Sequence, residues 1–217
     1  MGRKVNDMSY IELRNVSKTI KKNPVLKNVT LELKQHKIYG IQGVNGSGKT
    51  MLLRAISGLM RTEGKIRIQG RDPVTKGQPL DIGVMIELPG FLREFTGKEN
   101  LELLALIQKG ITEQDIVWAL RSVGLDETDN RRYGKYSLGM KQRLGIAQAI
   151  LGVPQLILLD EPTNAIDAGG VQQIKELVTD LKKQGSTLIL TSHDRMFLED
   201  LADEVITMEG GRVICRQ

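Results

Sequence analysis

The sequence predicts an α/β fold with a mainly parallel central sheet, an N-terminal antiparallel β subdomain and a helical subdomain insert. Short, almost wholly apolar runs recur along the chain, which is typical of strands buried on both faces of a parallel sheet. Near the N-terminus apolar and polar residues alternate instead, as they do in half-exposed strands. Between residues 88 and 150, apolar positions that recur every three or four residues indicate helices.

The antiparallel subdomain is predicted from residues 10–16 and 29–33, whose alternation indicates two strands joined by a turn around Lys22, Asn23 and Pro24. This part of the chain is basic: residues 1–80 carry 16 Lys and Arg against 5 Asp and Glu, whereas residues 81–217 carry 15 against 21. A basic segment can contact nucleic acid or anionic lipid. Few aromatic residues lie among these charges, so we expect no nucleic-acid partner and a solvated basic face.

A glycine-rich loop follows a strand predicted at residues 38–42 and precedes a helix predicted at residues 51–56. The loop fits the pattern G-x-x-x-x-G-K-[ST] with residues Gly43, Val44, Asn45, Gly46, Ser47, Gly48, Lys49 and Thr50. In such a loop, backbone N–H groups and a helix N-terminus point at phosphate oxygens. We expect Lys49 to contact the β- and γ-phosphates and the Thr50 hydroxyl to ligate Mg²⁺. The loop therefore predicts a P-loop NTPase.

The remaining elements follow from the same two periodicities. Helices are predicted at residues 98–109, 112–123 and 138–151, and buried strands at residues 82–86, 156–159, 187–190 and 205–208. We expect one domain over residues 1–217. Its nucleotide-binding core, with the β subdomain, comprises residues 1–87 and 151–217, and its helical subdomain comprises residues 88–150.

Two carboxylates, Asp160 and Glu161, end the strand predicted at residues 156–159. Ligands gather at the carboxyl ends of strands in open α/β sheets, so we expect Asp160 to hold Mg²⁺. Glu161 is expected to orient and deprotonate the attacking water as the general base. The alternative is an acidic pair that merely ends a strand and caps the turn at Pro162.

Four segments follow one another along the chain: the glycine loop, the stretch Tyr-Ser-Leu-Gly-Met-Lys-Gln-Arg-Leu-Gly-Ile-Ala at residues 136–147, the acidic pair and His193. Their order resembles that of the ATP-binding cassette family, and the resemblance covers roughly residues 10–214. The resemblance implies that His193 contacts the γ-phosphate and helps the base. It also implies that Ser137 and Gly139 bind ATP held by a second subunit, and that Asp167 communicates across that interface. Otherwise Ser137 would be a helix N-cap and His193 a structural residue at a strand end.

Two positions depart from the family pattern: Ile20 stands where an aromatic residue normally stacks on adenine, and Glu87 where a glutamine normally reaches Mg²⁺. The Glu87 carboxylate could coordinate the metal, although it adds negative charge beside the γ-phosphate. Glu87 and the altered signature resemble the bacterial subgroup associated with bacitracin resistance, lantibiotic self-immunity and multidrug export. A docking groove for a membrane subunit, or an ordinary packed corner, is predicted from Leu88, Pro89, Phe91, Leu92 and Phe95.

These inferences predict an ATPase subunit of an ABC transporter, of export type, that uses ATP and Mg²⁺. Its expected partners are a separate transmembrane permease subunit and a second cassette subunit, in a homodimer or a heterodimer. The longest uncharged run is too short and broken to span a bilayer, so we expect a cytoplasmic protein, peripheral on the inner face of the cell membrane. The alternatives are a non-transport ATPase that acts on ribosomes or DNA, and a regulatory module without turnover.

Overall fold

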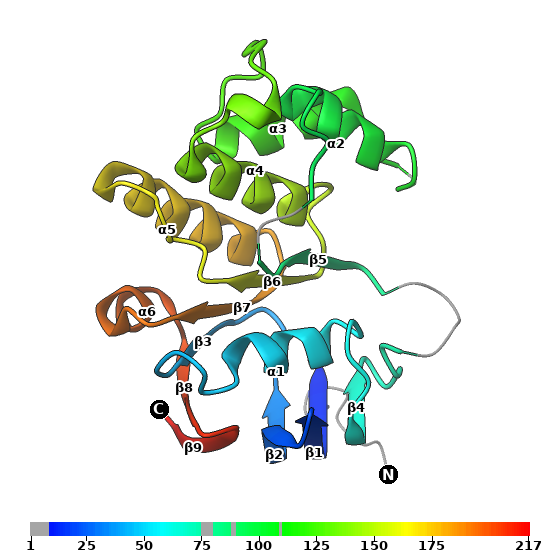
Figure 1. Cartoon of the computed structure of the whole chain (residues 1–217), viewed down its shortest axis with the longest axis vertical. Coiled ribbons are helices and arrows are strands. Elements are labelled where there is room, and N and C mark those ends of the chain that lie inside the picture. The colour runs from blue at the N-terminus through cyan, green and yellow to red at the C-terminus, as the bar shows by residue number, and fades with distance from the viewer. Residues whose placement is uncertain (1–8, 75–79, 88–89, 109) are drawn as a thin grey trace, which may run out of the picture.

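A six-stranded sheet lies at the centre of the computed structural model, which describes residues 9–74, 80–87, 90–108 and 110–217 (Figure 1). Its strands in spatial order are β5 (Ile82–Met85), β6 (Leu156–Asp160), β7 (Thr187–Ser192), β3 (Ile38–Gln42), β8 (Glu204–Glu209) and β9 (Arg212–Arg216). Neighbours from β5 to β8 run parallel, and β9 is antiparallel to β8. The apolar strands β3, β6 and β7 are buried over almost their whole length because both faces of the sheet are covered.

A second, antiparallel sheet of the described residues has the order β2-β1-β4, formed by β2 (Asn23–Leu33), β1 (Ile11–Ile20) and β4 (Glu63–Ile68). Leu13 of β1 pairs with Leu31 on one side and Ile66 on the other, and all three side chains are buried. The predicted turn lies slightly earlier, at Lys21 and Lys22, which have φ values of 46° and 69°. Asn23 and Pro24 already belong to β2, an edge strand, where a proline costs no ladder hydrogen bond.

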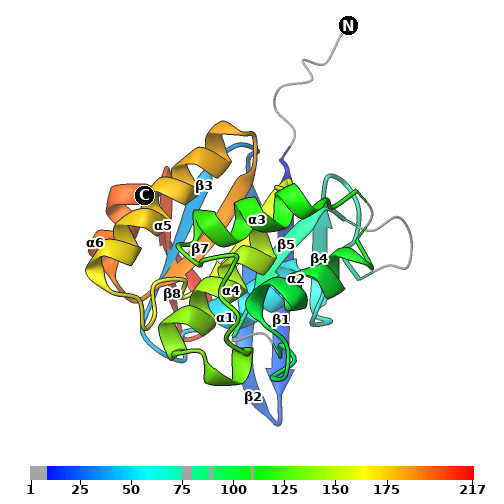
Figure 2. The same ribbon diagram turned by 90° about the horizontal axis from the view of Figure 1, so that it is seen from above.

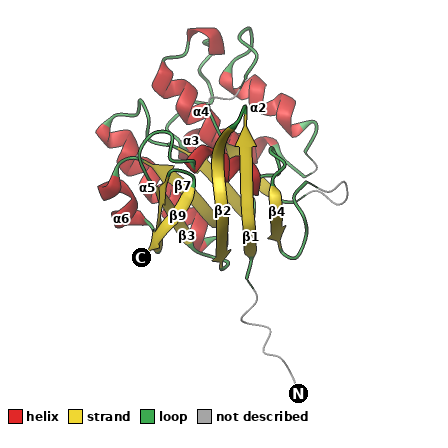
Figure 3. Cartoon of the chain, turned by 60° about the horizontal axis from the view of Figure 1, so that its bottom comes forward, coloured by secondary structure: helices red, strands yellow, loops and turns green. Residues whose placement is uncertain are grey.

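Helix α1 (Lys49–Ile56) lies between the two sheets and contacts both β6 and β2 (Figure 1). Figure 3 shows the antiparallel strands β2, β1 and β4 side by side. Its apolar residues Leu52, Leu53 and Ile56 are fully buried because they face two layers of strands. An isolated helix of this length is unstable in water, so packing against both sheets must hold it. The position of the loop that precedes α1 is therefore determined by the packing of the whole core.

The other face of the central sheet is covered by α4 (Leu138–Ile150), α5 (Ala168–Lys183) and α6 (Arg195–Leu201), with α2 (Gly97–Ala105) and α3 (Glu113–Ser122) packed outside α4 (Figure 2). A short 3₁₀ turn (Tyr133–Lys135) precedes α4. Gly83 of β5 lets α4 approach the sheet closely, since a Cβ there would lie 1.7 Å from the carbonyl oxygen of Ala149. The division into core and helical subdomain at residues 87 and 151 stays a prediction.

Local sequence signals mark the starts of helices α2 and α3. Thr96 and Thr112 cap α2 and α3, each in a capping box with the residue three positions on. The helix predicted at residues 98–109 ends at Ala105, which corrects the prediction. Its last apolar side chains, Leu106 and Ile107, are 82% and 81% exposed, so no core contact stabilises a further turn. None of the helices in the described residues combines the length and the apolar character that a membrane crossing needs.

Besides the 3₁₀ turn, four elements of the described residues lie outside the predicted set: β4, β9, α5 and α6. The two strands are edge strands of their sheets, with mostly exposed side chains and no apolar run longer than three residues. Helix α5 does carry a periodic signal, because Ile174, Leu177, Val178 and Leu181 recur at helical spacing and are buried.

Candidate active site

The glycine-rich loop joins the end of β3 to the start of α1. Gly48, the N-cap of α1, has a φ of 107°, which only glycine adopts readily, and its Cα faces the carbonyl oxygen of Val25 on β2. The loop is also tied to the turn between β8 and β9, where the Gly211 N–H donates to the Ser47 carbonyl at 2.9 Å. A Cβ on Gly46 would meet nothing within 4 Å, so this part of the loop borders open space.

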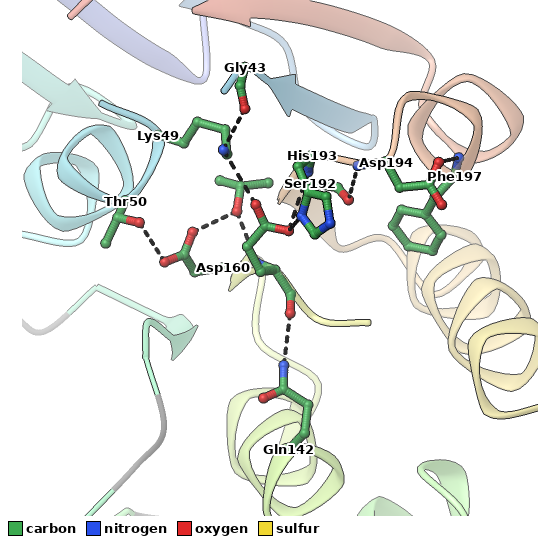
Figure 4. Close-up of polar contacts among 11 residues, drawn as sticks. Gly43, Lys49, Thr50, Gln142, Asp160, Ser192, His193, Asp194 and Phe197 are labelled. Atoms are coloured by element: carbon green, nitrogen blue, oxygen red, sulfur yellow. Dashed lines mark hydrogen bonds and ion pairs between the residues drawn. The ribbon is translucent and has the colours of Figure 1, made fainter. Parts of the chain in front are cut away.

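Lys49 is buried at the first position of α1, with only 6% of its side chain exposed. Its ammonium donates to the Gly43 carbonyl at 2.7 Å and lies 3.3 Å from Oε1 of Glu161 (Figure 4). No side chain caps the start of α1, and the buried Ser47 hydroxyl has no hydrogen-bond partner within the described residues. A buried cation, a free helix start and an orphaned hydroxyl together form a cradle that suits a phosphate group.

Asp160, at the end of β6, faces two hydroxyl groups. Its Oδ2 accepts from Thr50 Oγ1 at 2.7 Å, and its Oδ1 accepts from Thr191 Oγ1 at 2.6 Å. A hydroxyl and a carboxylate at this distance are hard oxygen donors of the kind that Mg²⁺ takes from a protein, with water and phosphate oxygens supplying the rest. The residues Thr50 and Asp160 therefore fit the predicted metal.

Glu161 follows Asp160 in a left-handed backbone conformation, with a φ of 47°. Its carboxylate is 17% exposed and bridges two groups: Oε1 lies 3.3 Å from Lys49 Nζ, and Oε2 lies 2.9 Å from His193 Nδ1. The His193 side chain is 63% exposed, so the Glu161 carboxylate can be reached from solvent on that side. The structure thus brings together Lys49, Glu161 and His193, which the sequence predicts to act on the γ-phosphate and the attacking water (Figure 4).

The predicted signature residues lie at the start of α4. Ser137 is the N-cap, and its Oγ accepts from the Met140 N–H at 3.2 Å, as the alternative interpretation expects. Gly139 lies against the turn after Glu161, since a Cβ on it would come within 2.7 Å of the Ala165 carbonyl. No hydrogen bond of the described residues joins Ser137 or Gly139 to the glycine loop of the same chain.

Glu87 does not join the Thr50 and Asp160 pair. It follows β5 with a φ of 62°, its side chain is 64% exposed, and Oε1 accepts from Arg54 Nη2 of α1 at 2.8 Å. Ile20, at the end of β1, is 38% exposed. Of the predicted docking groove, Leu88 and Pro89 lie outside the described residues, while the remaining members are Phe91, Leu92 and Phe95, the last two being 47% and 36% exposed.

Two site residues escape the sequence-based prediction. Thr191 is fully buried and connects the acidic pair, because its Oγ1 donates to Asp160 and accepts from the Glu161 N–H at 2.9 Å. A hydroxyl two residues before His193, at the end of an apolar run, is the signal that could have found it. Gln142 of α4 donates through Nε2 to the Glu161 carbonyl at 2.8 Å, and no motif in the sequence points to that contact.

A glycine loop ahead of a helix, a buried lysine within it, a hydroxyl–carboxylate pair and an adjacent glutamate define a nucleotide hydrolase of the P-loop class. A family model described as ABC transporter matches residues 26–164, more than half of the chain. The chain belongs to the ABC transporter family and is an ATP-binding, ATP-hydrolysing subunit of the kind that serves transport. The predicted family, fold class and enzyme class are therefore confirmed.

Similar proteins include curated bacterial transport subunits. The chain is 43% identical to the uncharacterized ABC transporter ATP-binding protein YybJ of Bacillus subtilis (strain 168), over 94% of both chains. It is 36% identical to the bacitracin transport ATP-binding protein BcrA of Enterococcus faecalis, over 95% of this chain and 69% of BcrA. It is 34% identical to the lantibiotic transport ATP-binding protein SrtF of Streptococcus pyogenes, over 94% of this chain and 89% of SrtF.

Among solved structures, the chain resembles a bacterial ABC transporter cassette in its dimeric form, with a TM-score of 0.88 and 27% identity over 95% of this chain and 97% of that one. The same values hold for a dimeric post-hydrolysis state of that cassette bound to ADP and phosphate. Cassettes of this family thus dimerise and hydrolyse ATP on this fold, and ATP is the nucleotide of the family. Nothing in these comparisons favours a ribosome- or DNA-directed ATPase.

Proposed function

We propose that the glycine loop binds the phosphates of ATP through its backbone N–H groups, the start of α1 and Lys49. The supporting observation is the buried Lys49 ammonium, which has a carbonyl and one carboxylate as partners and faces a loop with an orphaned hydroxyl. A cation buried to this extent is stabilised by added negative charge. The nucleotide-binding residues of this proposal are Gly43, Asn45, Gly46, Ser47, Gly48, Lys49 and Thr50.

Thr50 and Asp160 would hold Mg²⁺, exchanging their mutual hydrogen bond for the metal. When bound there, Mg²⁺ would neutralise the negative charge that develops on the phosphate groups. Glu87 is the third proposed ligand. It would reach the site by leaving Arg54. Breaking this exposed ion pair costs little free energy, because surface ion pairs contribute little to stability.

Glu161 would act as the general base. Water attacks the γ-phosphorus and gives its proton to the Glu161 carboxylate, while the bond from phosphorus to the bridging oxygen of ADP breaks. Lys49 keeps the carboxylate close to the phosphates, and His193, on the other carboxylate oxygen, holds it from the solvent side and would contact the γ-phosphate. The contacts from both sides leave the carboxylate few alternative orientations.

Ser137 and Gly139 would complete the site of a second subunit. They lie at the N-terminus of α4, which can bind anions, and no hydrogen bond of the described residues joins them to the glycine loop of their own chain. A head-to-tail pair of cassettes, identical or different, places each signature on the ATP of its neighbour. ATP then stabilises the closed dimer, and hydrolysis opens it.

We further propose that this motion drives a separate transmembrane permease that exports antimicrobial peptides of the bacitracin or lantibiotic kind. The relatives named for those peptides match the chain over 94–95% of its length. Leu92 and Phe95, a few positions after Glu87 in the sequence, leave apolar surface exposed where a permease helix could dock. The protein would then lie on the cytoplasmic face of the cell membrane.

The test is to purify the tagged chain from native membranes and identify what accompanies it. We expect a hydrophobic multi-span subunit whose presence makes ATP turnover respond to added bacitracin or lantibiotic. Recovery of ribosomes or DNA instead would refute the transport proposal. A permease whose complex responds to neither peptide would refute the export substrate while leaving the transport role intact.

A further inference from the structure

Gln142 lies on α4, outside the residues to which catalysis is assigned above, yet its side chain is almost fully buried against the active site. Its Nε2 donates to the main-chain carbonyl of Glu161 at 2.8 Å. Figure 4 shows the Gln142 amide directed from α4 toward the strand end that carries Asp160. A carbonyl oxygen can only accept, so the nitrogen of the amide must face Glu161.

The main chain of Glu161 needs such support. A φ of 47° is unfavourable for a residue with a Cβ, and neighbouring contacts must maintain it. The Glu161 N–H donates to Thr191 at 2.9 Å, and its carbonyl accepts from the Asn164 N–H at 3.2 Å as well as from Gln142. These three hydrogen bonds fix both peptide groups of Glu161, and hence the direction in which its carboxylate leaves the backbone.

Gln142 is the centre of one continuous face of α4. Gly139, Gln142 and Arg143 are spaced at i, i+3 and i+4, which places them side by side on a helix. Gly139 lies against the Ala165 carbonyl, and Arg143 Nη2 lies 3.4 Å from Asp167 Oδ1. This face therefore contacts the chain from Glu161 to Asp167 at three successive points.

We propose that Gln142 is a positioning residue for the base Glu161, and that it ties the base to the helix that begins at Ser137. The inference rests on the proposed roles of Glu161 and Ser137. When Ser137 binds the ATP of the second subunit, α4 is held in place, and Gln142 passes that placement to the Glu161 carbonyl. The placement of the base in each active site is thus linked to the binding of that chain's signature residue at the opposite site.

The test compares Gln142→Met with Gln148→Met. Methionine has a similar length but no amide donor, and Gln148 lies on the same helix with no side-chain hydrogen bond to Glu161. We expect Gln142→Met to lower kcat about ten- to a hundred-fold, the cost of misplacing a catalytic group. Its KM should change by less than about two-fold and its thermal midpoint by no more than a few degrees, as for a substitution with little effect on stability. Gln148→Met should leave kcat unchanged.

A second readout separates positioning from folding. In a Glu161→Gln background, Gln142→Met should still form the ATP-dependent dimer, because the base is already absent and the phosphate contacts remain. Unchanged kcat in Gln142→Met would overturn the proposal. So would a parallel loss of kcat, ATP affinity and thermal midpoint, which would show a purely structural role. If Glu161→Gln alone kept normal turnover, the assignment of the base would fail instead.

The tie to the signature helix is tested by a double-mutant cycle of Ser137→Ala and Gln142→Met. Residues that act through one helix give a combined loss of kcat smaller than the product of the single losses. Losses that multiply would overturn the tie, because they would show that the base and the signature residue act independently.

Discussion

The assignment of Glu161 as the base is tested most directly by Glu161→Gln. The substitution keeps the length of the side chain, so the amide can occupy the positions that lie 3.3 Å from Lys49 and 2.9 Å from His193. The three hydrogen bonds to its peptide groups involve main-chain atoms of residue 161 and are unaffected. The left-handed backbone should therefore persist, and the change reduces to the loss of a charge and of a proton acceptor.

The magnitude follows from that reduction. A positioned general base contributes about 10²- to 10⁴-fold to a rate, which corresponds to about 3–5 kcal/mol of transition-state stabilisation. Turnover of Glu161→Gln should fall by this factor. ATP affinity should be equal or higher, because the Lys49 ammonium loses a competing carboxylate 3.3 Å away and one negative charge fewer opposes the γ-phosphate.

The assay measures phosphate release together with ATP-dependent dimerisation by size-exclusion chromatography. We expect a stable ATP-bound dimer that releases phosphate slowly. Glu199→Gln is the matched control, since it removes an exposed carboxylate that pairs with Arg195 on α6. Normal turnover in Glu161→Gln would remove it from the role of base, and loss of ATP binding would show that its carboxylate holds the loop in shape.

Three further predictions concern the metal, the packing and the pH dependence. Glu87→Gln should raise the Mg²⁺ concentration needed for half-maximal turnover because it removes a ligand, and Arg54→Ala should lower it because it frees Glu87 from its 2.8 Å ion pair. The same Mg²⁺ dependence in both variants and the unaltered protein would exclude Glu87 as a ligand. Gly83→Ala should destabilise the fold by about 1–3 kcal/mol in denaturant unfolding, since its Cβ would lie 1.7 Å from the Ala149 carbonyl, and an unchanged midpoint would contradict the close packing of α4. Burial raises the pKa of Glu204, but hydrogen bonds from its two basic neighbours outweigh burial and lower that pKa overall, so the contribution of Glu204 to stability is complete above about pH 4.3 and is lost as the pH falls further. The thermal midpoint of Glu204→Gln should therefore fall less steeply in acid than that of the unaltered protein, and an identical pH profile would refute this.

The buried parallel strands and the glycine loop could be predicted because their signals are local. Apolar runs such as Leu156–Asp160 and the motif around Lys49 depend on adjacent residues, and the structure places them as expected. The edge strands β4 and β9 were not predicted because most of their side chains are exposed, and β4 also gains its hydrogen bonds from β1, which is distant in the sequence. The predicted end of α2 was wrong because the lack of a packing partner beyond Ala105 depends on the tertiary fold and not on the local sequence.

At the site, the chemistry of the residues could be predicted from the sequence better than their contacts in space. The meeting of Lys49, Glu161 and His193 follows from the order of strands in a parallel sheet, whose carboxyl ends lie at one edge. The pairing of Glu87 with Arg54 depends on the course of a loop and is not visible in either motif. Gln142 lies within the stretch at residues 136–147, but its contact with Glu161 escapes prediction because the packing of α4 against the chain after β6 is a tertiary property.

The hydrogen bond from Gly211 to the Ser47 carbonyl has a consequence for biosynthesis. It connects the phosphate loop to a turn more than 160 positions later in the sequence, and the same turn accepts from the Lys27 N–H at 2.8 Å. A nascent chain that has exposed only its first half holds the whole glycine motif but not the turn that braces it. The chain should therefore acquire tight ATP binding only once its last two strands have left the ribosome, which delays nucleotide capture until the cassette can also dimerise.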